Sequence, residues 1–361
     1  MNQDRDRIKR EWHADLPHSF GGKYRSYEYY KDLSNKKIDD EFKKNDIYTK
    51  FYQYRKAKHH NPIYVYRKRE QFQADSVKFP DPLMLKATNN IGYLLVIIDV
   101  FTKYVWLFPL KQIKGVNVAR CFQVLFNKNK PEKLTTDAGT EFLNQNVKRV
   151  LRDFNVKHFV AKGRTKAAVA ERFNLTIQRL IYQLCRYYNT NDWTSDIILE
   201  KAKTIYLNRN HRTIKMTPTE AEDPANQLDL RKIYYAKYRK SDEIKKKAKF
   251  KINDTVRISA LRGPFDRGYH QNFTTEVWTV SKVLDNLPLA RYIVKDEQNE
   301  ELDSILNENE LIAYQPSDVF QIDRVLKKRT RKGRKEVFVS WLHYDDKFNS
   351  WIPAENLENI V

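Results

Sequence analysis

An apolar run at residues 93–98 (Tyr-Leu-Leu-Val-Ile-Ile) places the strongest constraint on the fold of this chain. A strand this uniformly apolar is buried on both faces, as happens in a sheet covered by helices. The run ends at Asp99, and a second strand-like segment at 104–110 follows after a tight turn, so the two segments should pair as a hairpin. The centre of the chain is therefore predicted to be a sheet between layers of helices.

Strand and helix patterns alternate along residues 70–225. Strands are predicted at 71–79, 93–98, 104–110, 133–136 and 156–160, and helices at 116–126, 146–154, 167–188 and 194–208. The resulting order, β-β-β-α-β-α-β-α, predicts an α/β domain with a mixed five-stranded sheet and flanking helices.

Four further segments surround this predicted core. Residues 1–69 are polar, aromatic and basic and predict a small helical N-terminal region, and residues 226–249 predict a basic helical linker. Short alternating runs at 255–258, 277–283 and 292–294 predict a small β-barrel over 250–314. The last segment, 318–361, predicts strands at 320–326 and 337–341 around a basic turn at 327–335.

The charge balance favours a nucleic-acid partner. Lys and Arg number 67 against 46 Asp and Glu, a net charge of +21, which suits a phosphate backbone because each neutralised phosphate releases counterions. A merely basic soluble protein is the alternative. No apolar stretch approaches the ~20 residues of a membrane span, so no membrane partner is expected, and the polar residues 1–10 predict no secretory signal.

The two cysteines, Cys121 and Cys185, are too few for a disulfide framework and fit a reducing compartment. They also exclude a zinc site built from four cysteines. No Cys-x-x-Cys motif accompanies His13, His18 or the histidine pair at 59–60, so these histidines are interpreted as solvated or structural rather than as zinc ligands.

Three carboxylates occupy unusual positions in the predicted core. Asp75 lies in the middle of a strand, Asp137 ends the strand 133–136, and Glu171 lies in the first turns of the long helix. Helical spacing predicts that Glu171 points away from the apolar stripe of its own helix, towards the strand ends. A single Asp or Glu is more often an ordinary surface charge, so the spacing of the three carboxylates alone is weak evidence.

Such a set of carboxylates suits phosphodiester chemistry. In-line displacement at a phosphodiester can be catalysed by two Mg²⁺ ions, about 3.5–4 Å apart, that stabilise the attacking and leaving oxygens. Mg²⁺ prefers hard oxygen ligands, and three carboxylates on separate rigid elements would supply them. Asp75, Asp137 and Glu171 are therefore predicted to be the catalytic residues and the ligands of two Mg²⁺ (or Mn²⁺) ions.

Residues 72–215 resemble the catalytic core of retroviral-type integrases, which share the ribonuclease H-like fold. The resemblance rests on five runs: Phe-Gln-Ala-Asp at 72–75, Ile-Asp-Val-Phe-Thr-Lys-Tyr at 98–104, Thr-Asp-Ala-Gly-Thr-Glu-Phe at 136–142, Val-Ala-Glu-Arg-Phe-Asn at 169–174 and Asn-Arg-Asn-His-Arg-Thr-Ile at 208–214. It assigns the catalytic triad of the family to Asp75, Asp137 and Glu171. The chain is most similar to integrases of Maverick/Polinton elements and their virophage relatives, which also lack the N-terminal zinc domain of retroviral integrases.

The other polar residues of the core are expected to have roles other than metal binding. Asp99 does not match a metal ligand of the family, and its place at the start of the turn 99–103 predicts a turn-capping role. Candidate DNA contacts, with a solvated surface as the alternative, are Lys162, Arg164, Lys166, Arg172 and Asn174.

Residues 256–280 are similar to the SH3-like barrel that follows the core in this group. That similarity implies DNA contacts at Arg257, Arg262 and Arg267, together with the basic linker before them. A simple packing module is the alternative.

Residues 320–357 resemble a chromodomain. Chromodomains hold methyl-lysine in an aromatic cage, and the resemblance assigns this cage to Phe320, Trp341 and Tyr344. Trp351 is expected in the core of the module. Ordinary packing is the alternative for the three rings, and Leu-His at 342–343 departs from the usual Lys-Gly, which would weaken or retarget binding.

The function implied is that of an integrase/transposase, a polynucleotidyl transferase with associated endonuclease activity that processes DNA 3′ ends and joins them to host DNA. Its expected partners are double-stranded DNA (element ends and target), a histone-tail methyl-lysine and further copies of the chain, at least a dimer and a tetramer on DNA. Its expected location is the nucleus of the host cell, with packaging in a virion as a further option.

Two alternatives stand beside this function. A domesticated, catalytically silent DNA- or chromatin-binding protein would keep the fold, although the intact triad argues against it. A plain ribonuclease H-like nuclease would not need the basic linker and the two additional β modules, which suit a protein that holds two DNA partners.

Overall fold

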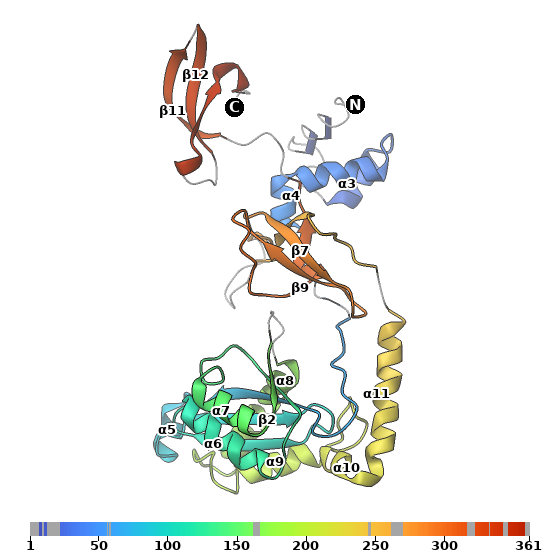
Figure 1. Cartoon of the computed structure of the whole chain (residues 1–361), viewed down its shortest axis with the longest axis vertical. Helices are drawn as coiled ribbons and strands as arrows, with labels where there is room; N and C mark the ends of the chain where they lie inside the picture. Colours follow the sequence, from blue (N-terminus) through green and yellow to red (C-terminus); the bar gives the residue numbers. More distant parts are fainter. Residues whose placement is uncertain are drawn as a thin grey trace.

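The computed structural model describes residues 7–8, 11–12, 22–55, 57, 59–161, 167–244, 247–260, 270–315, 322–331, 333–341 and 346–357. Figure 1 shows three tiers along the long axis: the α/β core at one end, the N-terminal helices with a β-sheet in the middle, and a β-hairpin unit at the other end. Helix α11 runs along one side and connects the core to the middle tier.

The core contains the predicted mixed sheet of five strands, in the order β3-β2-β1-β4-β5. Strands β1, β2 and β3 pair antiparallel, whereas β4 pairs parallel to both β1 and β5. The strand bounds are Gln71–Lys78 (β1), Tyr93–Asp99 (β2), Val105–Leu110 (β3), Lys133–Thr136 (β4) and Lys157–Val160 (β5).

Alternation along β2 explains why both faces of the sheet are covered. Leu95 and Ile97 pack with helices α6 (Gly115–Phe126) and α7 (Gln145–Asp153) on one face. Leu94, Val96 and Ile98 pack on the opposite face with α8 and α9, which span Ala168–Tyr187 and Leu199–Leu207. The apolar run that predicted a strand buried on both faces is thereby confirmed.

The helices of the core differ from the prediction at two places. Helix α5 (Pro82–Ala87) is absent from the prediction because its six residues are too short for a helical period; Asp81 caps it through the backbone N–H groups of Leu83 and Met84. The helix predicted from residue 194 begins only at Leu199, because Asp192 accepts hydrogen bonds from Thr194 and forms a turn there.

Helix α11 (Gln227–Asp242) confirms the predicted helical linker, but its inner face is packed rather than free. Leu230, Tyr234 and Tyr238 recur at every fourth position and are buried. The Tyr234 hydroxyl donates to the backbone carbonyl of Val100 (2.9 Å), and the Tyr238 hydroxyl donates to that of Val65 (2.9 Å). The short helix α10 (Pro218–Glu222) and the 3-10 turn Pro224–Asn226 precede it.

The middle tier combines segments from opposite ends of the chain. Helices α2 (Lys23–Tyr29), α3 (Asn35–Lys44) and α4 (Asp46–Phe51) pack against a five-stranded antiparallel sheet of order β10-β6-β7-β8-β9. The sheet comprises Thr255–Ile258 (β6), Trp278–Leu284 (β7), Arg291–Lys295 (β8), Leu306–Asn307 (β9) and Leu311–Ala313 (β10), with a 3-10 turn at Glu308–Glu310. The carbonyl of Lys50 accepts the N–H groups of Asn272 (2.8 Å) and Phe273 (3.0 Å), and that of Lys43 accepts the N–H of Gln315 (3.0 Å).

The C-terminal unit is a sheet of β11 (Ile322–Arg331), β12 (Arg334–Trp341) and β13 (Ser350–Pro353), with a 3-10 turn at Asp346–Phe348 before β13 and another at Ala354–Asn356 after it. The predicted basic turn at 327–335 is wrong, because both strands continue through it. Long basic side chains can occupy exposed strand positions, and Gly333, which lies in the reversal between the strands, has a φ of +76°.

Among the described residues, no helix has the length and apolar composition that a membrane crossing requires. Cys121 and Cys185 are free and buried.

Candidate active site

Strand β1 directs two polar side chains towards helix α8. Phe72 and Ala74 belong to the apolar cluster beneath α6 and α7, so the alternation of the strand places Gln73 and Asp75 on the other face. The Gln73 side-chain oxygen accepts the backbone N–H groups of Val169 (2.9 Å) and Ala170 (3.2 Å). Because α8 has no side-chain cap of its own, Gln73 caps it from the strand and fixes the start of the helix against β1.

Asp75 is half-buried and held by two donors. Its Oδ1 accepts the backbone N–H of Ser76 (2.8 Å), and its Oδ2 accepts the amide of Asn174 (2.9 Å). Burial raises the pKa of Asp75, the Ser76 N–H opposes this shift, and repulsion from Asp137, Glu171 and Glu141 raises the pKa further. The repulsion shows that these carboxylates share one region of the protein.

Asp137 follows β4, the parallel neighbour of β1. The parallel register ends with Gln73 opposite Thr135, so Asp137 follows the end of β4 on the side of the sheet edge towards which β1 continues to Asp75. The Asp137 Oδ1 accepts the backbone N–H of Gly139 (3.0 Å), which orients the carboxylate within its loop. Sheet topology therefore brings together two residues that are far apart in sequence.

Glu171 lies in the first turn of α8, where its side chain is exposed. A carboxylate at a helix N-terminus is stabilised by the unpaired N–H groups and the helix dipole. Since Gln73 fixes this turn against β1, Glu171 is held on the same side of the sheet as Asp75. The three predicted catalytic carboxylates thus come from two neighbouring strands and the helix packed on them.

Glu141 is a fourth carboxylate that the sequence prediction missed. Its Oε1 lies 3.4 Å from the Ser76 hydroxyl, and it raises the pKa of Asp75. A Cβ added to Gly139 would lie 2.5 Å from the Glu141 Oε2 and 3.0 Å from the Asp137 Oδ1. Gly139 therefore provides the space that lets both carboxylates approach the site, and the Asp-x-Gly-x-Glu spacing at 137–141 is the sequence signal.

The donor set fits a hard divalent cation, because all the converging ligands are carboxylate oxygens. The repulsion that raises the pKa of Asp75 is what a bound cation would relieve. In the described part of the chain, no three His, Cys, Asp or Glu side chains are already arranged to hold a metal ion. Metal binding would therefore require the three carboxylates to move closer together than they are here.

Asp99 has the predicted turn-capping role. It is fully buried and accepts the backbone N–H groups of Arg69 (2.7 Å), Phe101 (2.7 Å) and Thr102 (3.3 Å). Burial raises the pKa of Asp99 to about 6, and the N–H groups oppose this shift. The side chain is committed to the turn after β2.

Asn174 corrects a predicted DNA contact. Its side chain is 8% exposed and donates to Asp75, so it positions a carboxylate instead of meeting DNA at the surface. Helical spacing placed Asn174 on the same face as Glu171, but could not show that β1 covers this face. Arg172 is exposed, and its DNA contact remains a prediction. Its charge adds to the effect of burial on His211, which lowers the pKa of His211 to about 4.

Arg257 corrects a second predicted DNA contact. The side chain is buried at 1% exposure and pairs with Asp46 of α4 (2.5 Å). Its guanidinium also donates to the carbonyls of Thr274 and Thr275 and lies 3.9 Å from the centre of the Tyr314 ring. These contacts leave no surface for a phosphate. The other predicted contacts at Lys162, Arg164, Lys166, Arg262 and Arg267 lie outside the described residues.

Of the predicted aromatic cage, Phe320 and Tyr344 lie outside the described residues. Trp341 is half-buried, and its indole N–H donates to the Ser350 hydroxyl (3.0 Å). Trp351, expected in the core, is also only half-buried: it packs on Phe338 and carries the Arg329 guanidinium 3.9 Å from its ring centre.

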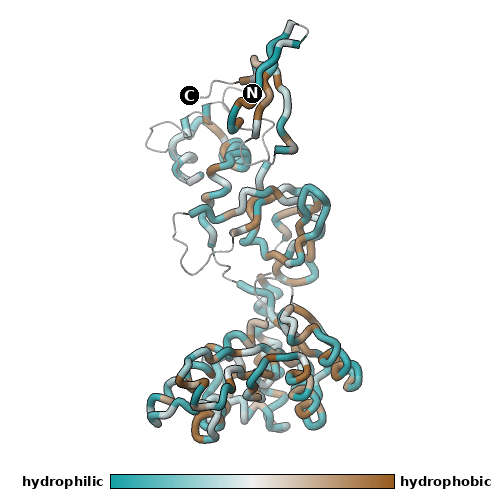
Figure 2. Tube along the Cα trace, turned by 90° about the vertical axis from the view of Figure 1, so that its left-hand side faces the viewer, coloured by the Kyte–Doolittle hydropathy of each residue, from teal (hydrophilic) through white to brown (hydrophobic). Residues whose placement is uncertain are grey.

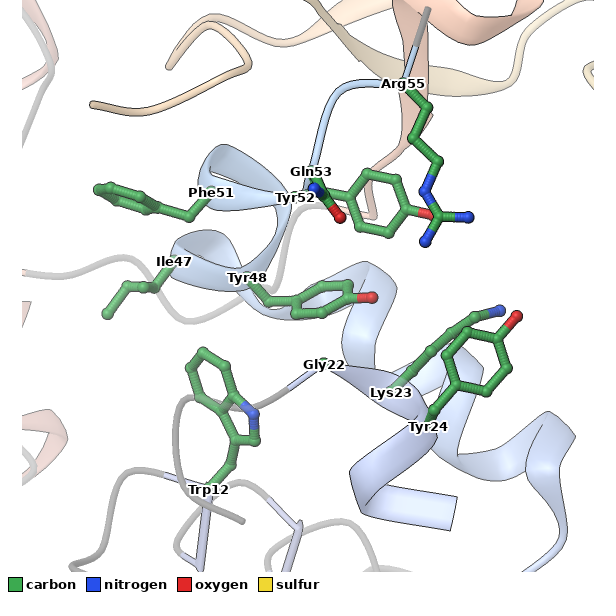
Figure 3. Close-up of a pocket in the computed structure, with 10 residues that line it drawn as sticks. All are labelled: Trp12, Gly22, Lys23, Tyr24, Ile47, Tyr48, Phe51, Tyr52, Gln53 and Arg55. Carbon is green, nitrogen blue, oxygen red and sulfur yellow. The ribbon is translucent and has the colours of Figure 1, made fainter. Parts of the chain in front are cut away.

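A separate cavity of about 570 Å³ lies among the N-terminal helices, and none of the predicted catalytic carboxylates lines it. Figure 3 shows the rings of Trp12, Tyr48 and Tyr52 around it, with Lys23 and Arg55 on one side. Of the three carboxylates, Asp75 and Asp137 are partly exposed and Glu171 is exposed.

Two segments of the chain match known protein families. Residues 71–165 match the integrase core domain family, and residues 320–360 match the chromo (chromatin organisation modifier) domain family. The core match includes Asp75 and Asp137 and ends before Glu171.

Three known proteins illustrate the relationship. A transposon-derived protein of Caenorhabditis elegans is 32% identical over 198 residues, which are 54% of this chain and 64% of that protein, so the chain spans less than two thirds of this relative. The transposase of transposon Tn552 from Staphylococcus aureus is 29% identical over 180 residues, 42% of this chain and 37% of the transposase. A chain of the simian T-cell lymphotropic virus intasome has a similar fold, with a TM-score of 0.51 and 13% identity over 78% of this chain and 92% of that chain. The chain therefore has the ribonuclease H-like fold in its core, with one segment that matches the integrase core domain family and another that matches the chromodomain family.

Proposed function

We propose that the chain is a DNA integrase of the transposon type, which trims DNA 3′ ends and transfers them into a second duplex. The observation that carries the proposal is the placement of Asp75 on β1, of Asp137 after the neighbouring parallel strand β4, and of Glu171 in the turn of α8 that Gln73 fixes against β1. The integrase core family match over 71–165 and the transposon-derived relatives support the same reaction class. The sequence motifs favour the Maverick/Polinton and virophage group within it.

Asp75, Asp137 and Glu171 would hold two Mg²⁺ or Mn²⁺ ions, which when bound stabilise the attacking and leaving oxygens of an in-line displacement. Asn174 would keep the Asp75 carboxylate in one rotamer through its 2.9 Å hydrogen bond. Gln73 would keep the first turn of α8, and with it Glu171, at a fixed position over β1. The protein's contribution is the placement of charge, since the reaction needs no covalent intermediate with a side chain.

Partners follow from the same proposal. The substrates are duplex element ends and target DNA, consistent with the net charge of +21. Two DNA ends must be joined in one event, so we infer a homo-oligomer, at least a dimer and a tetramer on DNA; the intasome that contains a chain of similar fold supports assembly. The chromodomain match supports targeting to a histone methyl-lysine through Phe320, Trp341 and Tyr344, in the nucleus of the host cell.

A strand-transfer assay tests the proposal with oligonucleotides that carry the element's own termini. The wild-type protein should join them in Mg²⁺ or Mn²⁺. Asp75→Asn, Asp137→Asn and Glu171→Gln should each abolish joining while the protein stays folded, because each removes a charge that balances the cations. Asp153→Asn, an exposed aspartate on α7, is the matched control and should join normally.

Joining at the wild-type rate by any of the three variants would overturn the assignment. A wild-type protein that binds the ends tightly but never joins them would favour the rival function, a catalytically silent DNA- or chromatin-binding protein.

A further inference from the structure

The chromodomain hairpin carries basic side chains that the proposed function does not use. Strand β11 pairs antiparallel with β12, and the register sets Lys327 opposite Phe338, Arg329 opposite Glu336, and Arg331 opposite Arg334. Directly paired residues point to the same face, and successive residues alternate. One face of the hairpin, here called the basic face, therefore presents Lys327, Arg329, Arg331 and Arg334.

The opposite face has a different composition. Lys328 is paired with Val337, and Thr330 with Lys335. Val337 is 3% exposed and Val339 is fully buried, so this face leads into the apolar core of the unit. The basic face instead contains Phe338 and, on β13, Trp351, both half-buried. The basic face therefore contains four cations, two aromatic rings and one acidic residue, Glu336.

Two of the four cations are unfavourably placed for the stability of the hairpin itself. Arg331 and Arg334 face each other directly beside the turn, and like charges opposite one another destabilise a strand pair. Both residues are exposed, as is Lys327. Arg329 differs, because it is anchored by Glu336 (2.6 Å) and stacks on Trp351. An external anion would relieve the repulsion that the fold leaves in place.

The shape of the hairpin indicates the kind of anion. Alternate residues on a strand are separated by about 6.7 Å, so Lys327, Arg329 and Arg331 form a regular row of charges. The major groove of duplex DNA admits a two-stranded β-ribbon, with phosphates along both edges. Figures 1 and 2 show the hairpin projecting beyond the rest of the chain, with hydrophilic residues at its end.

We propose that the basic face of the chromodomain hairpin, formed by Lys327, Arg331 and Arg334 around the anchored Arg329, binds the phosphate backbone of duplex DNA. A histone tail is itself cationic and would be repelled by this face, so the face is distinct from the methyl-lysine cage. The chromodomain would then contact DNA directly, whether or not the cage is occupied.

The first test compares two double variants of the full-length chain that remove the same charge. Arg331→Ala/Arg334→Ala clears the basic face near the turn, whereas Lys328→Ala/Lys335→Ala removes two exposed lysines from the opposite face. Binding to a duplex of unrelated sequence is measured by fluorescence anisotropy at several salt concentrations. Each lost phosphate contact lowers the slope of log K against log salt by about 0.9, so the first variant should lose about 2 and the second none.

When salt rises from about 50 to 200 mM, the DNA affinity of the wild-type protein should therefore fall by roughly tenfold more than the DNA affinity of Arg331→Ala/Arg334→Ala. Circular dichroism checks that the hairpin remains folded, which we expect because the substitutions remove a repulsion. Equal slopes for the two variants, or a wild-type slope in the first, would overturn the proposal.

Crosslinking provides a second measurement that does not depend on affinity. Lys327→Cys and Lys328→Cys place a thiol at adjacent positions on opposite faces, and the native Cys121 and Cys185 are buried and need no replacement. A duplex with a disulfide-activated tether on its backbone should trap Lys327→Cys several-fold more than Lys328→Cys. Equal trapping would contradict a defined DNA-binding face, and preferential trapping of Lys328→Cys would place DNA on the wrong side.

Discussion

The α/β core and the unit formed by α2–α4 with β6–β10, here called the middle unit, are stabilised in different ways. In the core, the key residues lie in or beside strands whose patterns are visible locally, as with Asp75 in β1 and Asp137 after β4. In the middle unit, the decisive contacts join the two ends of the chain, as between Asp46 and Arg257, 211 residues apart. The core can therefore be recognised from motifs, whereas the middle unit can be understood only once its long-range partners are known.

The largest expected effect tests the middle unit. Arg257→Ala should lower the free energy of unfolding of this unit by about 3 kcal/mol, because it breaks a largely buried ion pair and leaves the carbonyls of Thr274 and Thr275 without their donor. Denaturant unfolding followed by tryptophan fluorescence should show one transition shifted and the core transition unchanged.

The matched control is Arg257→Met, which keeps much of the volume of the side chain, leaves Asp46 paired with Lys50 (2.7 Å) and should recover part of the lost stability. If the core transition moved together with the middle unit in Arg257→Ala, the two regions would unfold as one and the comparison would fail.

The second prediction concerns the pH dependence of the core. The folded pKa of Asp99, about 6, lies above the ordinary value of 3.8, so the folded state binds the extra proton between these pH values. The contribution of Asp99 to stability is therefore present below about pH 4 and is lost as pH rises through about 6, by at most about 3 kcal/mol.

Unfolding free energies of wild type and Asp99→Asn, measured from pH 4 to 7, provide the test. The difference between them should decline with rising pH and level off above about pH 6. A difference that stays constant over this range would mean that the N–H donors of Phe101 and Thr102 outweigh burial.

The third prediction concerns the long-range contact on which the active site depends. Gln73→Ala removes the cap of α8 and should cost about 1–2 kcal/mol of stability while lowering strand transfer, because Glu171 loses its fixed position. Gln71→Ala is the control: this residue lies on the same strand and bonds Thr135 rather than α8. Equal losses of joining in both variants would show that Gln73 acts only through general stability.

The smallest effect is expected at Glu141. Glu141→Gln removes one carboxylate from the site and should lower the apparent affinity for Mn²⁺ several-fold. The affinity is measured from the rise in Tm as Mn²⁺ is added. Gly139→Ala should reproduce this change, because its Cβ would displace the Glu141 side chain. Glu200→Gln, an exposed glutamate on α9, should respond to Mn²⁺ as the wild type does. An unchanged response in Glu141→Gln would leave Asp75, Asp137 and Glu171 as the complete set.

Local pattern carried much of the core prediction. The bounds predicted for β4 agree with the structure residue for residue, as do those of β6 in the middle unit, since both are short runs of strand formers with clear ends. The turn-capping role of Asp99 was also visible, because its partners lie within three residues on one side. Asp75 was visible as a carboxylate in the middle of a strand and Asp137 as one at a strand end, and the parallel pairing of β1 with β4 then brings them together.

Other features depend on which surfaces meet, and sequence patterns do not encode that. Asn174 and Glu171 are one helical turn apart, yet the first is covered by β1 and the second is exposed. Arg257 has the composition of a DNA contact, but it is buried by a helix from the opposite end of the chain. In both cases the partner lies roughly 100 or more residues away, beyond the reach of periodicity.

Helix α11 has a fixed rotation relative to the core. Its 16 residues span about 24 Å, and the hydroxyls of Tyr234 and Tyr238 lock its rotation against the core. Because each helical residue turns by about 100° around the axis, one residue inserted after Tyr238 would rotate the end of the helix by more than a quarter of a circle, whereas seven would nearly restore its direction about 10 Å further out. The helix therefore sets both the distance from the core and the direction at which the chain leaves it at Asp242.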